Sequence, residues 1–106
     1  MSELWTMVTV VAASTTIASI TGGVLSAKME HRITGAARRD PRFAALRLRA
    51  HFTAFYVSAV LVLLLMHFWI ERRGGVSWLE IVAFIALMTV MAVGGEVMLY
   101  RRSLLR

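Results

Sequence analysis

The sequence predicts an all-α membrane protein with three transmembrane helices, the second and third forming a tight antiparallel hairpin. The first observation is a pair of long runs without Asp, Glu, Lys or Arg, Leu4–Ala27 and Phe52–Ile70. The second is that a chain of only 106 residues is 58% hydrophobic. A soluble chain this small has too little interior to hide such segments from water. A lipid bilayer must therefore surround them.

We expect one domain whose segments alternate between membrane and water. At about 1.5 Å per residue, the first run reaches about 36 Å, which crosses a hydrocarbon core of about 30 Å with some tilt. It is not expected to be a cleaved signal peptide, because Met1–Glu3 carries no basic residue and the run is too long. The predicted segments are a first span at about 4–27, a basic connector at 28–49, a second span at about 50–70, a hairpin loop at 71–76, a third span at about 77–100 and a basic tail at 101–106.

Local signals mark the helix ends. Gly35 favours a left-handed cap that stops the first helix. Asp40-Pro41 favours the start of the second helix, because Asp caps the backbone N–H groups and Pro lacks only an N–H that would have no partner there. Ser77-x-x-Glu80 is a capping-box pattern that predicts the start of the third helix.

Charge predicts the orientation. The connector and tail hold ten of the twelve Lys and Arg residues, the hairpin loop holds two and the N-terminus none. The positive-inside rule then places the N-terminus outside and both the connector and the C-terminus in the cytoplasm, in what we expect to be a bacterial inner membrane. Beside spans, a net charge of +6 indicates contact with anionic lipid rather than nucleic acid. The arginines expected to contact lipid headgroups or a partner are Arg38, Arg39, Arg42, Arg47, Arg49, Arg101 and Arg102.

Small residues recur at every fourth position of the first span and so share one helix face. Such a face lets a neighbouring helix approach closely, which drives association where lipid removes the hydrophobic effect. The alternative is that the hydroxyls only bond to carbonyls of their own helix. The predicted helix-packing residues are Thr15, Ser19, Gly23 and Ala27 on this face, together with Ala54, Ser58, Gly94 and Gly95.

Few side chains in the spans could carry chemistry, and none lies near the midplane, so a proton relay or ion site there is not expected. In an antiparallel hairpin, His51 lies level with Glu96 and His67 level with Glu80. On each helix the two positions are about 160° apart around the axis, so only one pair can face the interface between the second and third helices. Since Glu80 belongs to the capping box, we predict a polar inter-helix contact of Glu96 with His51 or with Arg49. The alternative is that Glu96 pairs with Arg101 in its own tail.

Cofactor and metal chemistry is not expected. The candidate haem ligands, His51 and His67, are about 24 Å apart along the helix and cannot bind one iron, so each would need a histidine from another helix or subunit. The chain has no cysteine, and no phosphate-binding loop or catalytic serine–histidine–acid set is present. We therefore expect no cofactor, no metal and no enzymatic activity.

Three function hypotheses remain. The leading one is a non-catalytic accessory or assembly subunit of a larger membrane complex, or a self-associating helix bundle that docks through Thr15, Ser19 and Gly23. The second is a pore former, because the size, three spans, orientation and basic tail are similar in topology to three-span phage holins, although the long connector departs from their short loops. The third is a haem-binding or transport subunit that acts as a multimer.

Overall fold

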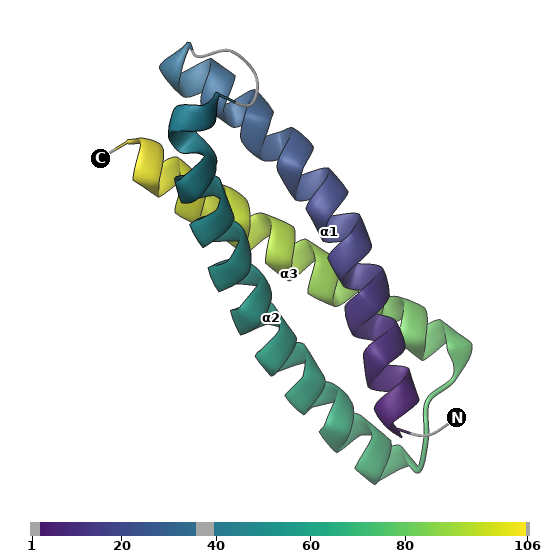
Figure 1. The fold of residues 1–106 in the computed structure, drawn as a ribbon. Helices are drawn as coiled ribbons and strands as arrows, with labels where there is room; N and C mark the ends of the chain where they lie inside the picture. Colours follow the sequence, from purple (N-terminus) through teal and green to yellow (C-terminus); the bar gives the residue numbers. More distant parts are fainter. Residues whose placement is uncertain (1–2, 36–39, 106) are drawn as a thin grey trace.

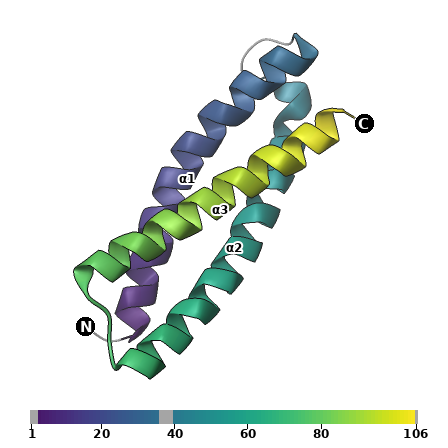
Figure 2. The ribbon, with the colours of Figure 1, turned by 180° about the vertical axis from the view of Figure 1, so that it is seen from behind.

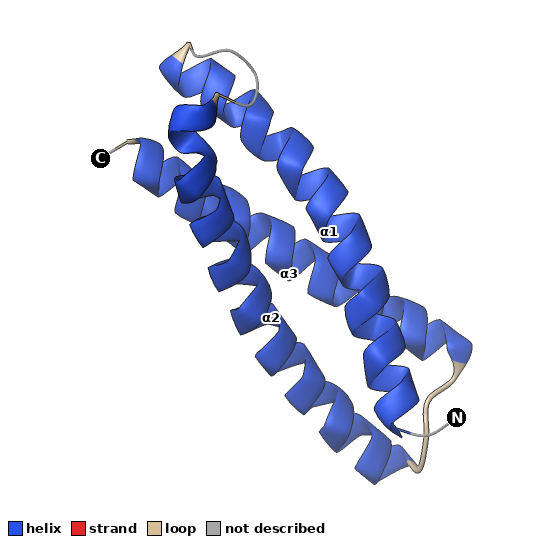
Figure 3. Ribbon diagram, viewed as in Figure 1, coloured by secondary structure: helices blue, strands red, loops and turns tan. Residues whose placement is uncertain are grey.

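Three long helices make up almost all of the computed structural model, which describes residues 3–35 and 40–105. In order they are α1 (Glu3–Thr34), the short 3₁₀ helix η1 (Pro41–Phe43), α2 (Ala44–Arg73) and α3 (Trp78–Leu104). Figure 3 shows helix and loop, and no strand, in this part of the chain. Each long helix is long and apolar enough to cross a membrane. The prediction of an all-α protein with three such helices is confirmed.

The helix ends follow the local signals. Gly35 and Gly74, just past α1 and α2, both have a positive φ, at 71° and 80°. Ser77 and Glu80 form both hydrogen bonds of the capping box. Asp40 caps η1, not α2 directly, by accepting a hydrogen bond from the Arg42 backbone N–H at 3.0 Å. The Arg42 side chain also bonds to Asp40 and holds the pKa of that carboxyl below its ordinary value.

All three long helices extend beyond the predicted spans. α2 continues to Arg73 in the predicted loop and α3 to Leu104 in the predicted tail, and two helices extend into the connector. α1 continues to Thr34 and α2 already begins at Ala44. The residues after Ala27 include Lys, Met, Glu and Arg, which are good helix formers, and no Gly or Pro interrupts them before Gly35. The connector is therefore largely helical in its described part. Arg38 and Arg39 lie outside the described residues.

α3 is the central helix. It contacts both α1 and α2 extensively, whereas α1 and α2 contact each other little. Figures 1 and 2 show α1 and α3 running in the same direction and α2 running opposite to both. The orientation across a membrane and the tight hairpin of α2 and α3 stay predictions.

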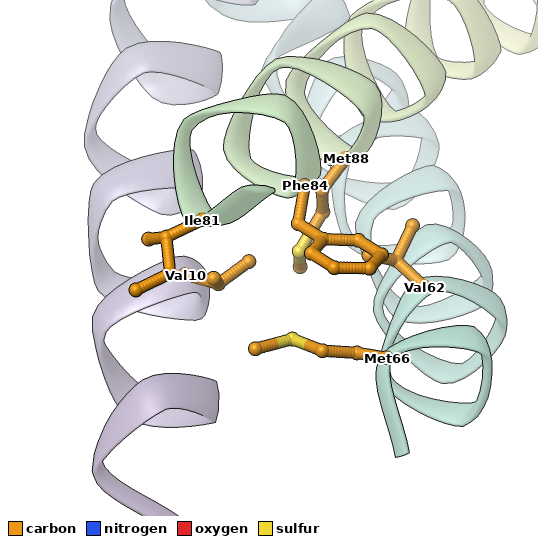
Figure 4. Packing of buried hydrophobic residues seen from close by; sticks show 6 residues of the cluster. All are labelled: Val10, Val62, Met66, Ile81, Phe84 and Met88. Atoms are coloured by element: carbon orange, nitrogen blue, oxygen red, sulfur yellow. The ribbon is translucent and has the colours of Figure 1, made fainter. Parts of the chain in front are cut away.

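The apolar core lies in the half of the bundle near the 74–77 loop. All three long helices contribute to it, as Figure 4 shows. Many large apolar side chains instead point away from the bundle, such as Leu79 at 80% exposed. Such an exterior suits hydrocarbon rather than water. The buried core residues are Val10, Val62, Met66, Ile81, Phe84 and Met88.

The loop offers a matched test of backbone conformation. Gly74→Ala should destabilise the protein by about 1–2 kcal/mol, because a side chain is disfavoured at positive φ. Gly75→Ala should be neutral, since its φ is not in that region and its Cβ would meet nothing within 4 Å. Unfolding by a denaturing detergent, followed by circular dichroism, measures both. Equal stability of the two variants would contradict the structure.

Candidate functional site

The half of the bundle near the connector is held together by two buried carboxylates. Glu30 on α1 is 0% exposed and Glu96 on α3 is 4% exposed. A buried carboxylate is costly unless charged or hydrogen-bonding partners surround it. Each of these two has partners on both of the other long helices, so each ties the three helices together.

Glu96 is bonded to α2 and α1. His51 Nδ1 lies 2.6 Å from Glu96 Oε1, and the Ser26 hydroxyl donates to Glu96 Oε2 at 3.3 Å. Of the two partners predicted for Glu96, His51 is the one that the structure brings to it. Nearby, a Cβ added at Gly95 would lie 3.0 Å from the Ala54 Cβ. This close approach of α2 and α3 brings the imidazole within reach of the carboxylate.

Glu30 has a parallel set of partners. The Tyr100 hydroxyl donates a hydrogen bond to it, the Arg47 Nε lies 3.1 Å from its Oε2, and the Asp40 backbone N–H donates to its Oε1 at 3.2 Å. Sequence analysis missed this site because Glu30 was assigned to the water-exposed connector. A signal was present, however. Ser26 and Glu30 on α1 have the same four-residue spacing as Glu96 and Tyr100 on α3, and parallel helices bring such pairs together one turn apart.

The opposite end of the bundle has a separate, more exposed group. His67 Nδ1 lies 2.5 Å from Glu3 on α1, and its Nε2 lies 3.2 Å from Glu71. Glu80 accepts a hydrogen bond from the Trp69 indole. His67 therefore contacts α1 and its own helix, while Glu80 completes its capping box. Of the two pairs that lie at the same depth, His51/Glu96 and His67/Glu80, only His51 and Glu96 meet at the interface of α2 and α3, as helix geometry requires.

The face of α1 that packs inside the bundle is adjacent to the predicted small-residue face. Thr15 and Ser19 are exposed, Gly23 is half-buried and Ala27 is buried. Thr15 and Thr16 donate to carbonyls one turn back, at 2.6 and 3.0 Å, which is the alternative role considered for these hydroxyls. The inward-facing residues, again four apart, are Thr6, Val10, Ser14, Ala18, Gly22 and Ser26.

The remaining helix-packing candidates differ in burial. Ala54 and Ser58 are buried on α2, and the Ser58 hydroxyl donates to the Ala54 carbonyl. Gly95 lies against α2, whereas Gly94 is exposed and a Cβ there would meet nothing within 4 Å.

Thr15, Ser19 and Gly23 line an open groove between α1 and α2. The groove has a volume of about 480 Å³, and His51 and Glu96 also line it. We call it the α1–α2 groove. It presents a run of small residues beside a polar pair, on a side of the bundle where two helices hardly touch.

The predicted headgroup arginines fall into two groups. Arg42 is paired with Asp40 and Arg47 with Glu30, so both have carboxylate partners within the chain. Arg49, Arg101 and Arg102 are exposed.

Within residues 3–35 and 40–105, no three His, Asp or Glu side chains are grouped so as to hold a metal ion. His51 and His67 contact different carboxylates, on α3 and on α1. Comparisons with protein-family models, curated proteins and solved structures find no match for the chain.

Two adjacent glycines test the packing around Glu96. A Cβ at Gly22 would lie 2.0 Å from Glu96 Oε2, whereas one at Gly23 would meet nothing within 4 Å. Gly22→Ala should therefore push the carboxylate off its partners and destabilise the protein by about 1–3 kcal/mol. Gly23→Ala should be neutral or slightly stabilising, because Ala favours a helix. Detergent-induced unfolding of both variants measures this, and a neutral Gly22→Ala would contradict the described position of Glu96.

The His51–Glu96 interaction can be isolated with a double-mutant cycle. Glu96→Gln replaces the carboxylate that contacts the imidazole with an amide and should cost about 1–3 kcal/mol. Combined with His51→Phe, it should show a coupling energy of at least about 0.5 kcal/mol. Glu80→Gln is the comparison, since Gln can replace Glu in a capping box and the change should cost little. Additive effects of the His51 and Glu96 substitutions would refute a direct interaction.

Proposed function

We propose that this protein is a non-catalytic accessory or assembly subunit in the bacterial inner membrane. In this proposal the α1–α2 groove receives a transmembrane helix of a larger membrane complex. The N-terminus faces outward, and the connector and C-terminus face the cytoplasm, as the distribution of basic residues favours.

The observation that carries the proposal is the location of the small residues that α1 does not use internally. Thr15, Ser19 and Gly23 point into an open groove instead of the core. Small side chains allow close backbone approach, and close packing is what joins helices in lipid. The chain already packs the adjacent face of α1 against α3, so the groove-facing side is free to receive a second helix.

The end of the groove supplies a polar anchor. His51 is only partly covered, with a side chain 21% exposed, and it lies beside the buried Glu96. In hydrocarbon, a hydrogen bond to such a group contributes about 1–2 kcal/mol to helix association. A polar side chain on the incoming helix would therefore fix its depth in the groove.

The pore-forming alternative requires a hydrophilic face that lines a channel. The exposed hydroxyls of Thr9, Thr15 and Thr16 each donate to a carbonyl four residues earlier. Their donor capacity is thus met without water. This favours helix docking over a water-filled lumen.

The test is the native mass of the tagged protein after gentle detergent extraction from its own host membrane, with identification of everything that comes with it. Gly23→Leu should fill the groove and reduce the amount of co-purified partner about tenfold. Gly94→Leu is the matched control, since both positions have open space around a Cβ, and it should retain the partner.

A ladder of homo-oligomers with nothing else bound would overturn the accessory-subunit proposal. Abrupt growth arrest on induced expression would then support the pore former. Because the chain has no cysteine, Ser19→Cys also provides a unique cross-linking site in the groove, and Val90→Cys, on an exposed position of α3, is its control.

A further inference from the structure

We propose that a second pocket, between α1 and α3 at the connector end, binds the phosphate headgroup of an anionic phospholipid. The pocket has a volume of about 380 Å³. Three basic residues line it, Lys28 and Arg32 from α1 and Arg101 from α3. We call it the α1–α3 pocket. It shares no lining residue with the α1–α2 groove, and only its placement on the cytoplasmic side rests on the proposed function.

The charge in this pocket is not balanced within the described part of the chain. Lys28 and Arg32 are one helical turn apart on the same face of α1, and Arg101 approaches from α3. No Asp or Glu lines the pocket, and none of the described carboxylates forms an ion pair with these three side chains. Arg42 and Arg47, by contrast, have carboxylate partners. An external anion is the natural partner of three converging, unpaired cations.

The apolar lining favours a phospholipid over a free anion. Leu25, Ile33 and Val97 also line the pocket. The contacts of Ser26 with Glu96 and of Glu30 with Tyr100 set the register of α1 and α3. Leu25 and Val97 therefore lie about one turn deeper in the bundle than Arg101. An acyl chain would pack against the deeper apolar side chains while its phosphate contacts the cations above.

The location matches this chemistry. Basic pockets between transmembrane helices on the cytoplasmic side are typical sites for anionic headgroups. Lys28 and Arg32 belong to the connector and Arg101 to the tail, the two segments that hold most of the positive charge. Lys28 and Arg32 were not among the headgroup candidates taken from the sequence. Only the packing of α1 on α3 places them opposite Arg101.

The experiment is a titration of the full-length, detergent-solubilised protein with phosphatidylglycerol, read as bound lipid by native mass spectrometry. Phosphatidylcholine serves as the zwitterionic comparison and should bind much more weakly. Near an anionic surface each basic residue contributes about fivefold in affinity. Lys28→Gln, Arg32→Gln and Arg101→Gln together should therefore lower the affinity for phosphatidylglycerol on the order of a hundredfold.

The control compares two double variants of equal net charge. Lys28→Gln with Arg32→Gln should lower the affinity for phosphatidylglycerol about 25-fold. Arg72→Gln with Arg73→Gln, at exposed positions outside the pocket lining, should bind phosphatidylglycerol nearly as well as the unaltered protein. Arg101→Gln alone, with a loss of about fivefold, keeps the test informative if the triple variant fails to fold. An equal loss in the two double variants, equal binding of phosphatidylcholine, or displacement of the lipid by inorganic phosphate would each overturn the proposal.

Discussion

The structure depends on two carboxylates that are buried where three helices meet. In an apolar environment, an ionised carboxylate without partners is far costlier than one that is hydrogen-bonded and charge-paired. Glu96 has an imidazole and a hydroxyl as partners, and Glu30 has a guanidinium, a phenol and a backbone N–H. Because the partners come from different helices, satisfying the carboxylates fixes how the helices lie relative to one another.

This requirement matters more here than in a soluble protein. When lipid surrounds the bundle, burying apolar side chains between helices gives little advantage over leaving them in hydrocarbon. The apolar core, built around Met66, Phe84 and Met88, supplies close packing near the loop. At the other end, the polar contacts set the register of the three helices relative to one another. The two ends therefore differ in their buried contacts. Apolar packing is buried near the loop, where the polar contacts of His67 are more exposed, and hydrogen-bonded carboxylates are buried at the other end.

The two surfaces with proposed roles follow from this arrangement. α3 lies between the other two helices and packs against one face of α1. A second small-residue face of α1 therefore remains open beside α2. The same packing of α1 on α3 gathers Lys28, Arg32 and Arg101 around one pocket. One surface suits a helix and the other an anionic headgroup. Both are consequences of a single helix register, which the Ser26–Glu96 and Glu30–Tyr100 contacts determine.

The sequence by itself determined which segments are helical and apolar, and which local signals lie at their ends. Runs without charge, Gly35, Gly74, Asp40-Pro41 and the Ser77–Glu80 box act locally, so neighbouring residues suffice to predict them. The sequence also predicted His51 as one of two partners for Glu96, because His51 and Glu96 have the same depth in an antiparallel hairpin. The sequence did not determine which side of α1 faces inward, since small residues recur every fourth position on two adjacent faces.

Only the tertiary structure decided which side of α1 faces inward. Gly22 lies against the Glu96 carboxylate, where a Cβ would collide with it, and Gly23 does not. The tertiary structure also brought Glu30 into contact with Tyr100 and Arg47, although the sequence placed Glu30 in a water-exposed connector. Both outcomes depend on contacts between residues far apart in the chain, which the four-residue spacings on α1 and α3 do not specify by themselves.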